Sequence, residues 1–266
     1  MAKRKGFTRD TIIRTLVGAL KPLNYAHAFY EGGAVAFNRT DEWSDIDLYI
    51  IVDDTRVKET FLAVEKALKS LSPIRRKLEV PQLPYPGAFQ AFYKLDNASE
   101  YLIIDLVILQ LNSPEKFLEP KIHGNVIFYF NKNGKITSNP LDIDAFVKKL
   151  HARLERLKAR FDMFNNFVQK ELNRGNYLEA IDLYRALTLA TLVEILRIKQ
   201  NPLHYDFGMR YVHYELPKEA IKKLESLYFA KDAKDLQEKY LEATNWFHEL
   251  MLEIDGEQIE KLVRTP

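Results

Sequence analysis

The chain has 266 residues, of which 47% are hydrophobic and 29% charged, with 39 basic and 37 acidic side chains. It contains no cysteine, which excludes disulfides, a thiolate nucleophile and cysteine-ligated metal, so any metal must be held by oxygen or histidine. The formal net charge of +2 gives no overall field for nucleic acid, and no apolar run is long enough to span a bilayer. We therefore expect a cytoplasmic protein without a membrane segment.

The first half of the sequence alternates between helical and strand patterns. Thr8 can cap a helix whose apolar residues recur at helical spacing, and the run from Ile46 to Val52 has the β-branched and aromatic content of a buried strand. In chain order the patterns predict a helix at 8–20, strands at 26–30 and 46–52, a helix at 57–71, and strands at 89–95, 101–109, 126–130 and 135–137. Together these elements predict a mixed β-sheet.

Beyond Pro140 the strand patterns cease. Apolar residues at alternating three- and four-residue steps predict one long helix over about 147–168. Further helices are predicted at about 177–199, 217–228 and 233–254. The sequence thus predicts an α+β protein with a boundary near residue 140, in which a small mixed-sheet domain (1–140) precedes an all-α helical bundle (141–266).

Two carboxylates stand at alternate positions where the strand at 46–52 begins. Because alternate strand residues point to the same face, Asp45 and Asp47 can jointly bind a divalent cation. Two like charges this close disfavour each other's ionised form unless a cation compensates them. Mg²⁺ is the expected cation, with Mn²⁺ as a substitute, since it prefers hard oxygen ligands and bridges carboxylates to phosphates.

A third carboxylate, Asp105, is the only polar side chain between Leu102 and Leu109. An ionised carboxylate in so apolar a strand is costly unless it is paired with a cation or a polar partner. If this strand lies beside the one that carries Asp45 and Asp47, the three carboxylates can hold two metal ions about 3.5–4 Å apart for displacement at phosphorus.

Gly32 and Gly33 precede the acidic pair. Two glycines permit a tight strand-to-helix turn with positive φ, whose backbone amides can approach a phosphate. Eleven residues separate Gly33 from Asp45. This spacing predicts a phosphate-binding turn beside the metal site.

These motifs resemble the DNA polymerase β-like nucleotidyltransferase superfamily. Its signature is Gly-Gly or Gly-Ser, nine to thirteen residues, then Asp-hydrophobic-Asp-hydrophobic, with a third carboxylate on a later strand. Gly32-Gly33 and Asp45-Ile46-Asp47-Leu48 match that signature, and Asp105 stands at the third position. The predicted layout is similar to the minimal and antibiotic-type prokaryotic members. The motifs cover the first 110 residues or so, and the helical half matches by architecture alone.

The resemblance implies catalytic roles for three residues and binding roles for others. Asp45 and Asp47 would hold the metals that carry a nucleoside triphosphate, most simply ATP. Asp105 would bind the catalytic metal and help to deprotonate an acceptor hydroxyl, so that a nucleoside monophosphate is transferred and pyrophosphate released. Many members have Ser at the position of Gly33, so phosphate contact here would depend on the amides of Gly32 and Gly33, with Arg39 and Ser44 as further candidates.

The acceptor is expected to be a small molecule or a protein hydroxyl, bound on the side of the helical bundle. A polynucleotide is disfavoured because no block of basic and aromatic residues suggests a track for its backbone. Association into homo-oligomers stays open. Two alternative functions also stay open: a catalytically weak nucleotide-binding or antitoxin-like partner module, and ribonuclease activity of the helical domain. The latter depends on Arg197 and His204, which match the loose Arg-x(4–6)-His spacing of HEPN-type ribonucleases.

Other polar residues have ordinary structural interpretations. The pair Asp142 and Asp144 repeats the acidic spacing without a glycine pair and is expected to stabilise a helix N-terminus. The triplet at 206–208 matches a kinase metal motif but lacks that family's other features, so a turn is expected. Arg185, Glu194 and Arg197 lie on an otherwise apolar helix and are expected to form salt bridges between helices; the alternative is that Arg185 or Arg197 faces the cleft and meets the triphosphate or acceptor. In the sheet domain, Trp43 and Tyr49 are candidates for stacking on a base, and Gln90 and Tyr93 are candidates for lining the cleft near the site.

Overall fold

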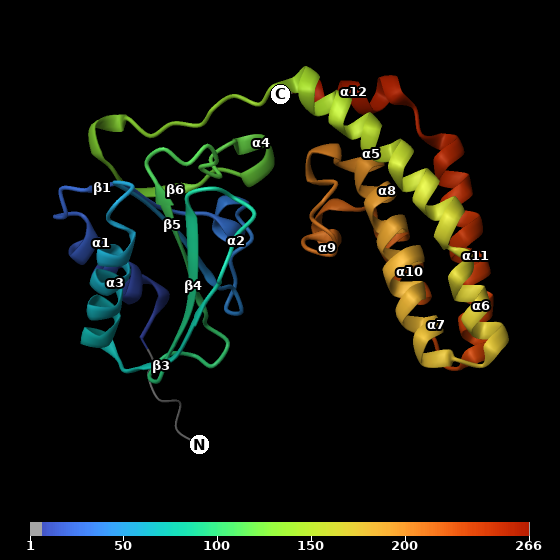
Figure 1. The fold of residues 1–266 in the computed structure, drawn as a ribbon, viewed down its shortest axis with the longest axis horizontal. Helices are drawn as coiled ribbons and strands as arrows, with labels where there is room; N and C mark the ends of the chain where they lie inside the picture. The colour runs from blue at the N-terminus through green and yellow to red at the C-terminus, as the bar shows by residue number, and fades with distance from the viewer. Residues whose placement is uncertain (1–6, 266) are drawn as a thin grey trace. The chain divides into compact units, whose positions relative to one another are not determined.

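The computed structural model describes residues 7–265 (Figure 1). Backbone contacts divide the chain into two compact units, residues 1–140 and 141–266. The first unit is built on a six-stranded sheet and the second consists of helices, which confirms the predicted α+β fold class. Whether the units act as a catalytic domain and an acceptor-side domain stays a prediction.

The sheet of the first unit is mixed, with the order β3-β4-β5-β2-β1-β6. Strands β2 and β5 run parallel at its centre, and every other neighbouring pair is antiparallel. The elements of this unit in chain order are α1 (Arg9–Leu20), β1 (Ala26–Glu31), α2 (Gly33–Ala36), β2 (Ile46–Val52), α3 (Val57–Leu71), β3 (Ile74–Glu79), β4 (Ala88–Leu95), β5 (Ile104–Gln110), α4 (Pro120–His123) and β6 (Ile127–Asn131).

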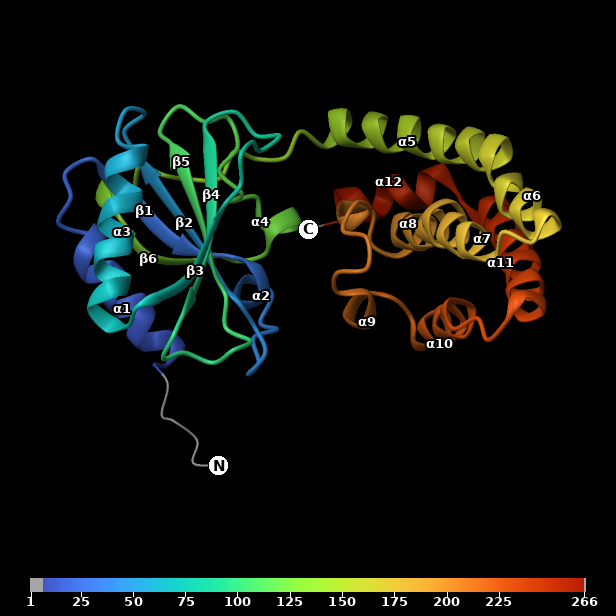
Figure 2. The same ribbon diagram turned by 60° about the horizontal axis from the view of Figure 1, so that its bottom comes forward.

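The two faces of the sheet have separate cores because side chains alternate along each strand. Helices α1 and α3 cover one face, as Figures 1 and 2 show, over the even-numbered apolar residues of β2 and β5 such as Leu48 and Leu106. The opposite face carries a smaller cluster that includes Tyr30, Ile51 and Leu109. Odd-numbered positions of β2 and β5, among them 47 and 105, belong to that second face.

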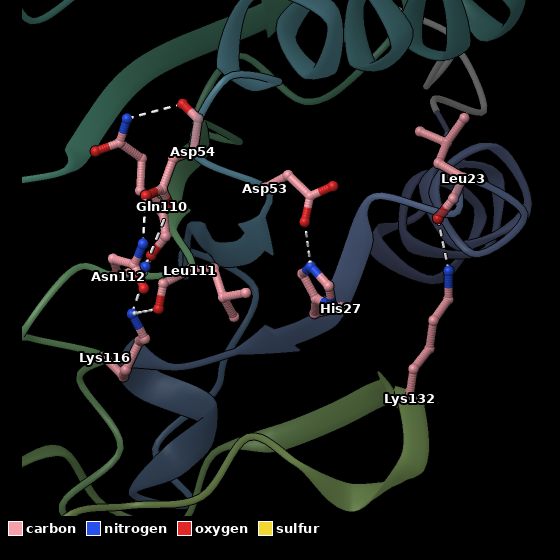
Figure 3. A network of polar contacts seen from close by, with 9 residues as sticks. All are labelled: Leu23, His27, Asp53, Asp54, Gln110, Leu111, Asn112, Lys116 and Lys132. Carbon is pink, nitrogen blue, oxygen red and sulfur yellow. Dashed lines mark hydrogen bonds and ion pairs between the residues drawn. The ribbon is translucent and has the colours of Figure 1, made fainter.

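Polar contacts close the far end of the central strands, where β2 and β5 finish (Figure 3). The carboxylate of Asp54 accepts hydrogen bonds from the backbone and side-chain amides of Asn112, and Gln110 donates to the Asp54 carbonyl. Lys116 donates to the carbonyls of Gln110 and Leu111 at 2.9 and 3.0 Å. These bonds fix the carboxyl ends of the parallel strands and leave the opposite ends, where residues 45–47 and 105 lie, for other chemistry.

Two of the strand predictions need correction, and one strand was not predicted. The segment 135–137 is not a strand: Asn131 bonds both backbone groups of Ile136 through its side chain, and a 3₁₀ turn (Lys132–Gly134) intervenes. Strand β5 begins at Ile104 rather than at 101, because residues 99–102 form a turn. Strand β3 was not predicted at all, since Arg75, Arg76 and Lys77 separate its apolar ends.

The described residues of the second unit, 141–265, form helices joined by turns and loops, with no strand among them. Its core contains the apolar stripe predicted for the long helix, from Val147 to Phe161. Asp142 caps that helix by accepting from the Ala145 amide, which confirms its structural interpretation. The elements are α5 (Ile143–Phe164), α6 (Asn166–Arg174), α7 (Tyr177–Leu183), a π-helix (Tyr184–Leu189), α8 (Ala190–Gln200), a 3₁₀ turn (Pro202–His204), α9 (Val212–Glu215), α10 (Lys218–Tyr228), α11 (Ala233–Glu253) and α12 (Gly256–Arg264).

The predicted long helix is interrupted at Asn165, which separates α5 from α6. The Asn165 side chain is buried, donates to Thr244 and Tyr240 on α11, and accepts from Thr188 in the π-helix. The helix predicted at 177–199 is likewise divided into α7, the π-helix and α8. Helix α12 was not predicted. In residues 7–265 no helix is long and apolar enough to cross a bilayer.

Candidate active site

Asp47 and Asp105 lie side by side on the two parallel strands. They are register partners in the β2–β5 ladder, and both are half-buried on the face opposite α1 and α3. The condition set by the sequence, that the strand of Asp105 should adjoin that of Asp47, is therefore met. Neighbouring strands lie about 4.8 Å apart, so side chains at one register position on the same face are adjacent. Two carboxylates are thus held together by the central pair of the sheet.

Asp45 lies one residue before β2, on the same side as Asp47. Its Oδ1 accepts a hydrogen bond of 3.1 Å from the backbone amide of Ile103, whose carbonyl in turn accepts from the Ile46 amide. The Asp45 carboxylate thereby fastens the start of β2 to the residue before β5. It adds a third acidic group to the same end of the strands.

Gly32 and Gly33 connect β1 to the single turn α2 and lie against the acidic strand. The Gly32 amide donates to the Asp47 carbonyl at 2.9 Å. Gly33 has φ +59°, and a Cβ placed on it would stand 1.8 Å from Oδ2 of Asp47. Serine, which the resembled family often has here, would therefore collide with the Asp47 carboxylate. The second glycine of this pair is therefore required by the close packing of the turn against Asp47.

Asp105 is held in a partly desolvated setting. Gln90 on β4 donates its side-chain amide to both carboxylate oxygens, at 2.8 and 3.0 Å. Burial raises the pKa of Asp105 to about 6; the Gln90 hydrogen bonds oppose that rise, whereas the charges of Asp47 and Asp45 add to it. The sequence had marked Gln90 only as a side chain near the site, and the structure gives it a defined partner.

Arg9 supports the site from the helix-covered face. It donates to the Asp45 carbonyl at 2.7 Å and forms an ion pair with Glu31, a buried carboxylate that Tyr129 also contacts. Burial lowers the pKa of Arg9, and the negative charges around it, those of Asp47 and Asp45 included, oppose this shift. Sequence reasoning missed both Arg9 and Glu31, although an acidic residue in the last position of an apolar strand was a signal that a cation is near.

Ser44 and Arg39 lie in the segment between α2 and β2. The Ser44 hydroxyl donates to Asp41 Oδ1 at 2.8 Å and accepts from the Asp41 amide at 2.9 Å, so it closes the loop at 41–44. The Arg39 guanidinium lies over the ring of Phe37, 5.1 Å from its centroid. A phosphate contact by either side chain stays a prediction.

The aromatic candidates divide between the two faces. Trp43 packs edge-on against Tyr101 at 5.0 Å between ring centroids, and both are largely exposed, at 59% and 62%. Tyr49 stacks on Tyr30 on the face that carries the carboxylates. Tyr93, in contrast, is fully buried in the core under α1 and α3, which rules out the predicted place near the site. Positions 90 and 93 differ by an odd number, and a strand therefore turns their side chains to opposite faces.

Carboxylate oxygens of Asp45 and Asp105, which could bind a metal ion, accept hydrogen bonds from the protein in this structure. Among residues 7–265 no three His, Cys, Asp or Glu side chains stand close enough to form a ready-made metal site. Asp45 contacts the Ile103 amide and Asp105 the Gln90 amide, as described above. The donor chemistry nonetheless suits a hard cation, because Asp47 and Asp105 are register partners on one face and carboxylate oxygens are the ligands that Mg²⁺ prefers.

The residues considered for ribonuclease chemistry form a buried structural cluster. Arg197 is fully buried, with ion-pair and hydrogen-bond contacts to Glu215 and to the carbonyl of Gly208. His204, only 5% exposed, contacts the same Glu215. Neither side chain is open to a polynucleotide. The predicted salt-bridge set is present in altered form, since Glu194 pairs with Arg153 rather than with Arg197.

Comparisons with known proteins add little to this geometry. No family model matches the chain, and no curated protein matches it. Among solved structures, the chain is similar to a STING-associated CdnE c-di-GMP synthase from Capnocytophaga granulosa, with 18% sequence identity over 92% of this chain and 80% of that chain. The TM-score of 0.29 is too low to carry an argument about activity.

Proposed function

We propose that the chain is a metal-dependent nucleotidyltransferase that transfers a nucleoside monophosphate from a nucleoside triphosphate, ATP in the first instance, to a hydroxyl group. The placement of Asp47 and Asp105 as register partners on parallel strands carries the proposal. Asp45 beside them and the close approach of Gly33 to Asp47 support it. Few structural roles need three carboxylates at one strand end, because their mutual repulsion costs stability.

The carboxylates would hold Mg²⁺ or, in its place, Mn²⁺. Bound there, the cation would neutralise phosphate oxygens as charge develops at phosphorus. Asp45 and Asp47 would bind the metal that carries the triphosphate, and Asp105 the metal nearest the acceptor. The Gly33 amide, with Arg39 and Ser44 in the following segment, is the candidate for phosphate contact. Gly32 would contribute by shaping the turn, because its amide already donates to the Asp47 carbonyl.

The reaction requires a base for the acceptor proton. The acceptor oxygen forms a bond to the α-phosphorus, the bond from that phosphorus to pyrophosphate breaks, and the hydroxyl proton leaves. Asp105 is the candidate for this role, because its carboxylate stands beside Asp47 at the place proposed for the metal nearest the acceptor. Gln90 positions the carboxylate through its two hydrogen bonds. A small molecule or a protein hydroxyl is the favoured acceptor.

Pyrophosphate release tests the proposal. The protein is incubated with Mg²⁺, each nucleoside triphosphate and a panel of hydroxyl acceptors, and compared with Asp47→Asn and Asp105→Asn. Both variants should lose activity while retaining their circular dichroism. Asp53→Asn is the matched control, since Asp53 follows the far end of β2 and pairs with His27, and it should keep activity. Pyrophosphate release undiminished in Asp105→Asn would overturn the proposal.

Binding of Mn²⁺ separates an enzyme from a binding module. Electron paramagnetic resonance should show Mn²⁺ taken up together with a nonhydrolysable ATP analogue by the wild type, and weaker uptake by Asp47→Asn. Tight nucleotide binding without turnover on any acceptor would instead favour the nucleotide-binding partner module.

A further inference from the structure

A separate cavity of about 550 Å³ lies within the helical unit, between α5, α8 and the loop at 205–208. Helices α5 and α8 run side by side there (Figures 1 and 2). The space exists because three facing positions carry the smallest side chains: Ala152, Ala190 and Gly208. Its volume falls within the range of about 300–1,000 Å³ that is typical of small-molecule sites.

Three cations from one face of α5 line this cavity. Lys149, Arg153 and Arg156 stand at i, i+4 and i+7, so they share a helix face and extend about 10 Å along it. Two carboxylates, Glu194 and Asp206, complete the charged lining. The cavity therefore carries a net positive charge, although the whole chain is nearly neutral.

The ion pair between Arg153 and Glu194 leaves most of the positively charged donors of the cavity available to a ligand. Arg153 and Glu194 form a bidentate pair at 2.6 and 2.8 Å, which uses two of the five guanidinium N–H donors. Among residues 7–265, Lys149 and Arg156 have no ion-pair partner, and Lys149 lies 5.9 Å from the Tyr205 ring centroid. Two unpaired cations flanking a partly used guanidinium suit an anion with several oxygens.

The loop wall of the cavity is rigidly anchored. Buried Arg197 donates to the Gly208 carbonyl at 2.7 Å and to the carbonyl of Arg210. Glu215 accepts from Arg197 at 2.6 Å and also contacts His204. Because Arg197 is fully buried and donates to two carbonyls of the loop, it holds the backbone of this loop in one position. The buried cluster of Arg197, His204 and Glu215 therefore positions the loop that lines the cavity.

The opposite wall follows an irregular helix. The π-helix at Tyr184–Leu189 ends where Ala190 enters the cavity lining. π-Helices are rare, and those that occur often lie at functional sites. Their wider turn rotates the following residues relative to a regular helix. Here the following residues are Ala190 and Glu194, which form one side of the cavity.

We propose that this cavity binds a phosphorylated small molecule, through a phosphomonoester or polyphosphate group held by Lys149, Arg153 and Arg156. Guanidinium groups match phosphate oxygens in pairs, and the lysine adds a point charge. The Tyr205 ring and the small residues leave room for an organic portion beside the phosphate. This site lies wholly within the helical unit and does not depend on the proposed transferase activity.

Isothermal titration calorimetry tests the site on the full chain. The background variant is Asp47→Asn with Asp105→Asn, in buffer with EDTA, so that the carboxylate site does not contribute. Tripolyphosphate and adenosine monophosphate are the probes, and their comparison separates an inorganic from an organic phosphate ligand. One equivalent should bind, and Lys149→Ala or Arg156→Ala should weaken binding about tenfold or more.

Lys148→Ala and Lys158→Ala are the matched controls, because both residues lie on α5 outside the cavity. They should leave the affinity unchanged. Absence of binding at millimolar probe would overturn the proposal. Equal losses in controls and lining variants, with tighter binding of a single-stranded oligoribonucleotide, would indicate a diffuse nucleic-acid surface and would overturn it as well. Neither result would affect pyrophosphate release by the first unit.

Discussion

Gly33 approaches Asp47 so closely that any side chain at position 33 would occupy the space of the Asp47 carboxylate. The clash involves Oδ2 at 1.8 Å and extends to the carboxyl carbon at 2.4 Å and the Asp47 Cβ at 2.9 Å. The whole side chain of Asp47 would have to move. The glycine therefore sets the position of a proposed metal ligand without contributing any group to it.

Gly33→Ala should reduce Mn²⁺ binding and pyrophosphate release strongly. Gly134→Ala is the control, since Gly134 has nearly the same φ, +62°, but nothing within 4 Å of an added Cβ. Both changes should cost about 1–2 kcal/mol of unfolding free energy from the left-handed backbone. Only Gly33→Ala should displace Asp47. Equal activity in the two variants would show that the position of Asp47 does not limit the reaction.

Unfolding free energy in EDTA should depend on pH through Asp105. Its pKa is about 6 in the folded protein against an ordinary value of 3.8, so the folded state binds this proton more tightly than the unfolded state. The resulting stability is complete below about pH 4 and is lost as the pH rises to about 6 and above, by roughly 3 kcal/mol. Urea titrations of the wild type and Asp105→Asn across pH 4–8 measure this difference. Parallel curves would contradict it.

Gln90→Ala should raise the pKa of Asp105 further. The two amide hydrogen bonds favour the ionised carboxylate, and their loss leaves burial and the two neighbouring charges unopposed. Carbon-13 NMR titration of aspartate carboxyl groups measures the change. Gln110→Ala serves as the control because that glutamine donates to the Asp54 carbonyl at the far end of β5. If the pKa of Asp105 is the same in both variants, Gln90 does not act on the Asp105 carboxylate.

Arg197→Met should destabilise the helical unit by about 3–5 kcal/mol. The substitution leaves the carboxylate of Glu215 buried without its guanidinium partner. Lys199→Ala, which removes a partner of the exposed Glu253, should cost no more than about 1 kcal/mol. Thermal unfolding of both variants provides the comparison. A loss in Arg197→Met no larger than that in Lys199→Ala would show that the pair does not stabilise the unit.

Much of the sheet unit follows from local sequence. Strand β2 and helix α3 have the predicted bounds, because one is a continuous β-branched run and the other a regular apolar stripe that ends before Pro73. Strand β3 escaped prediction because it lies at the sheet edge, where positive charges are tolerated and indeed protect the edge from association. The break at Asn165 was hidden because the apolar spacing continues on both sides of it.

The candidate site was predictable only in its acidic and glycine positions. The spacing of Asp45 and Asp47 is local, and the polarity of Asp105 stands out in an apolar strand. The roles of Arg9 and Gln90 arise from tertiary contacts with residues distant in sequence, which leave no periodic signal. The steric demand at Gly33 likewise depends on how β1 and β2 pack.

The parallel pairing of β2 with β5 also has a kinetic consequence. The bond from Ile103 to Asp45 spans 58 residues, and the ladder that aligns Asp47 with Asp105 must close a loop of the same length. We expect closure of this loop to follow formation of α3 and the hairpin of β3 and β4, since contacts between distant residues form more slowly than local ones. We therefore expect Asp105 to join Asp45 and Asp47 late in folding. A partly unfolded chain would then lack the complete set of carboxylates, and metal uptake would report completion of the fold.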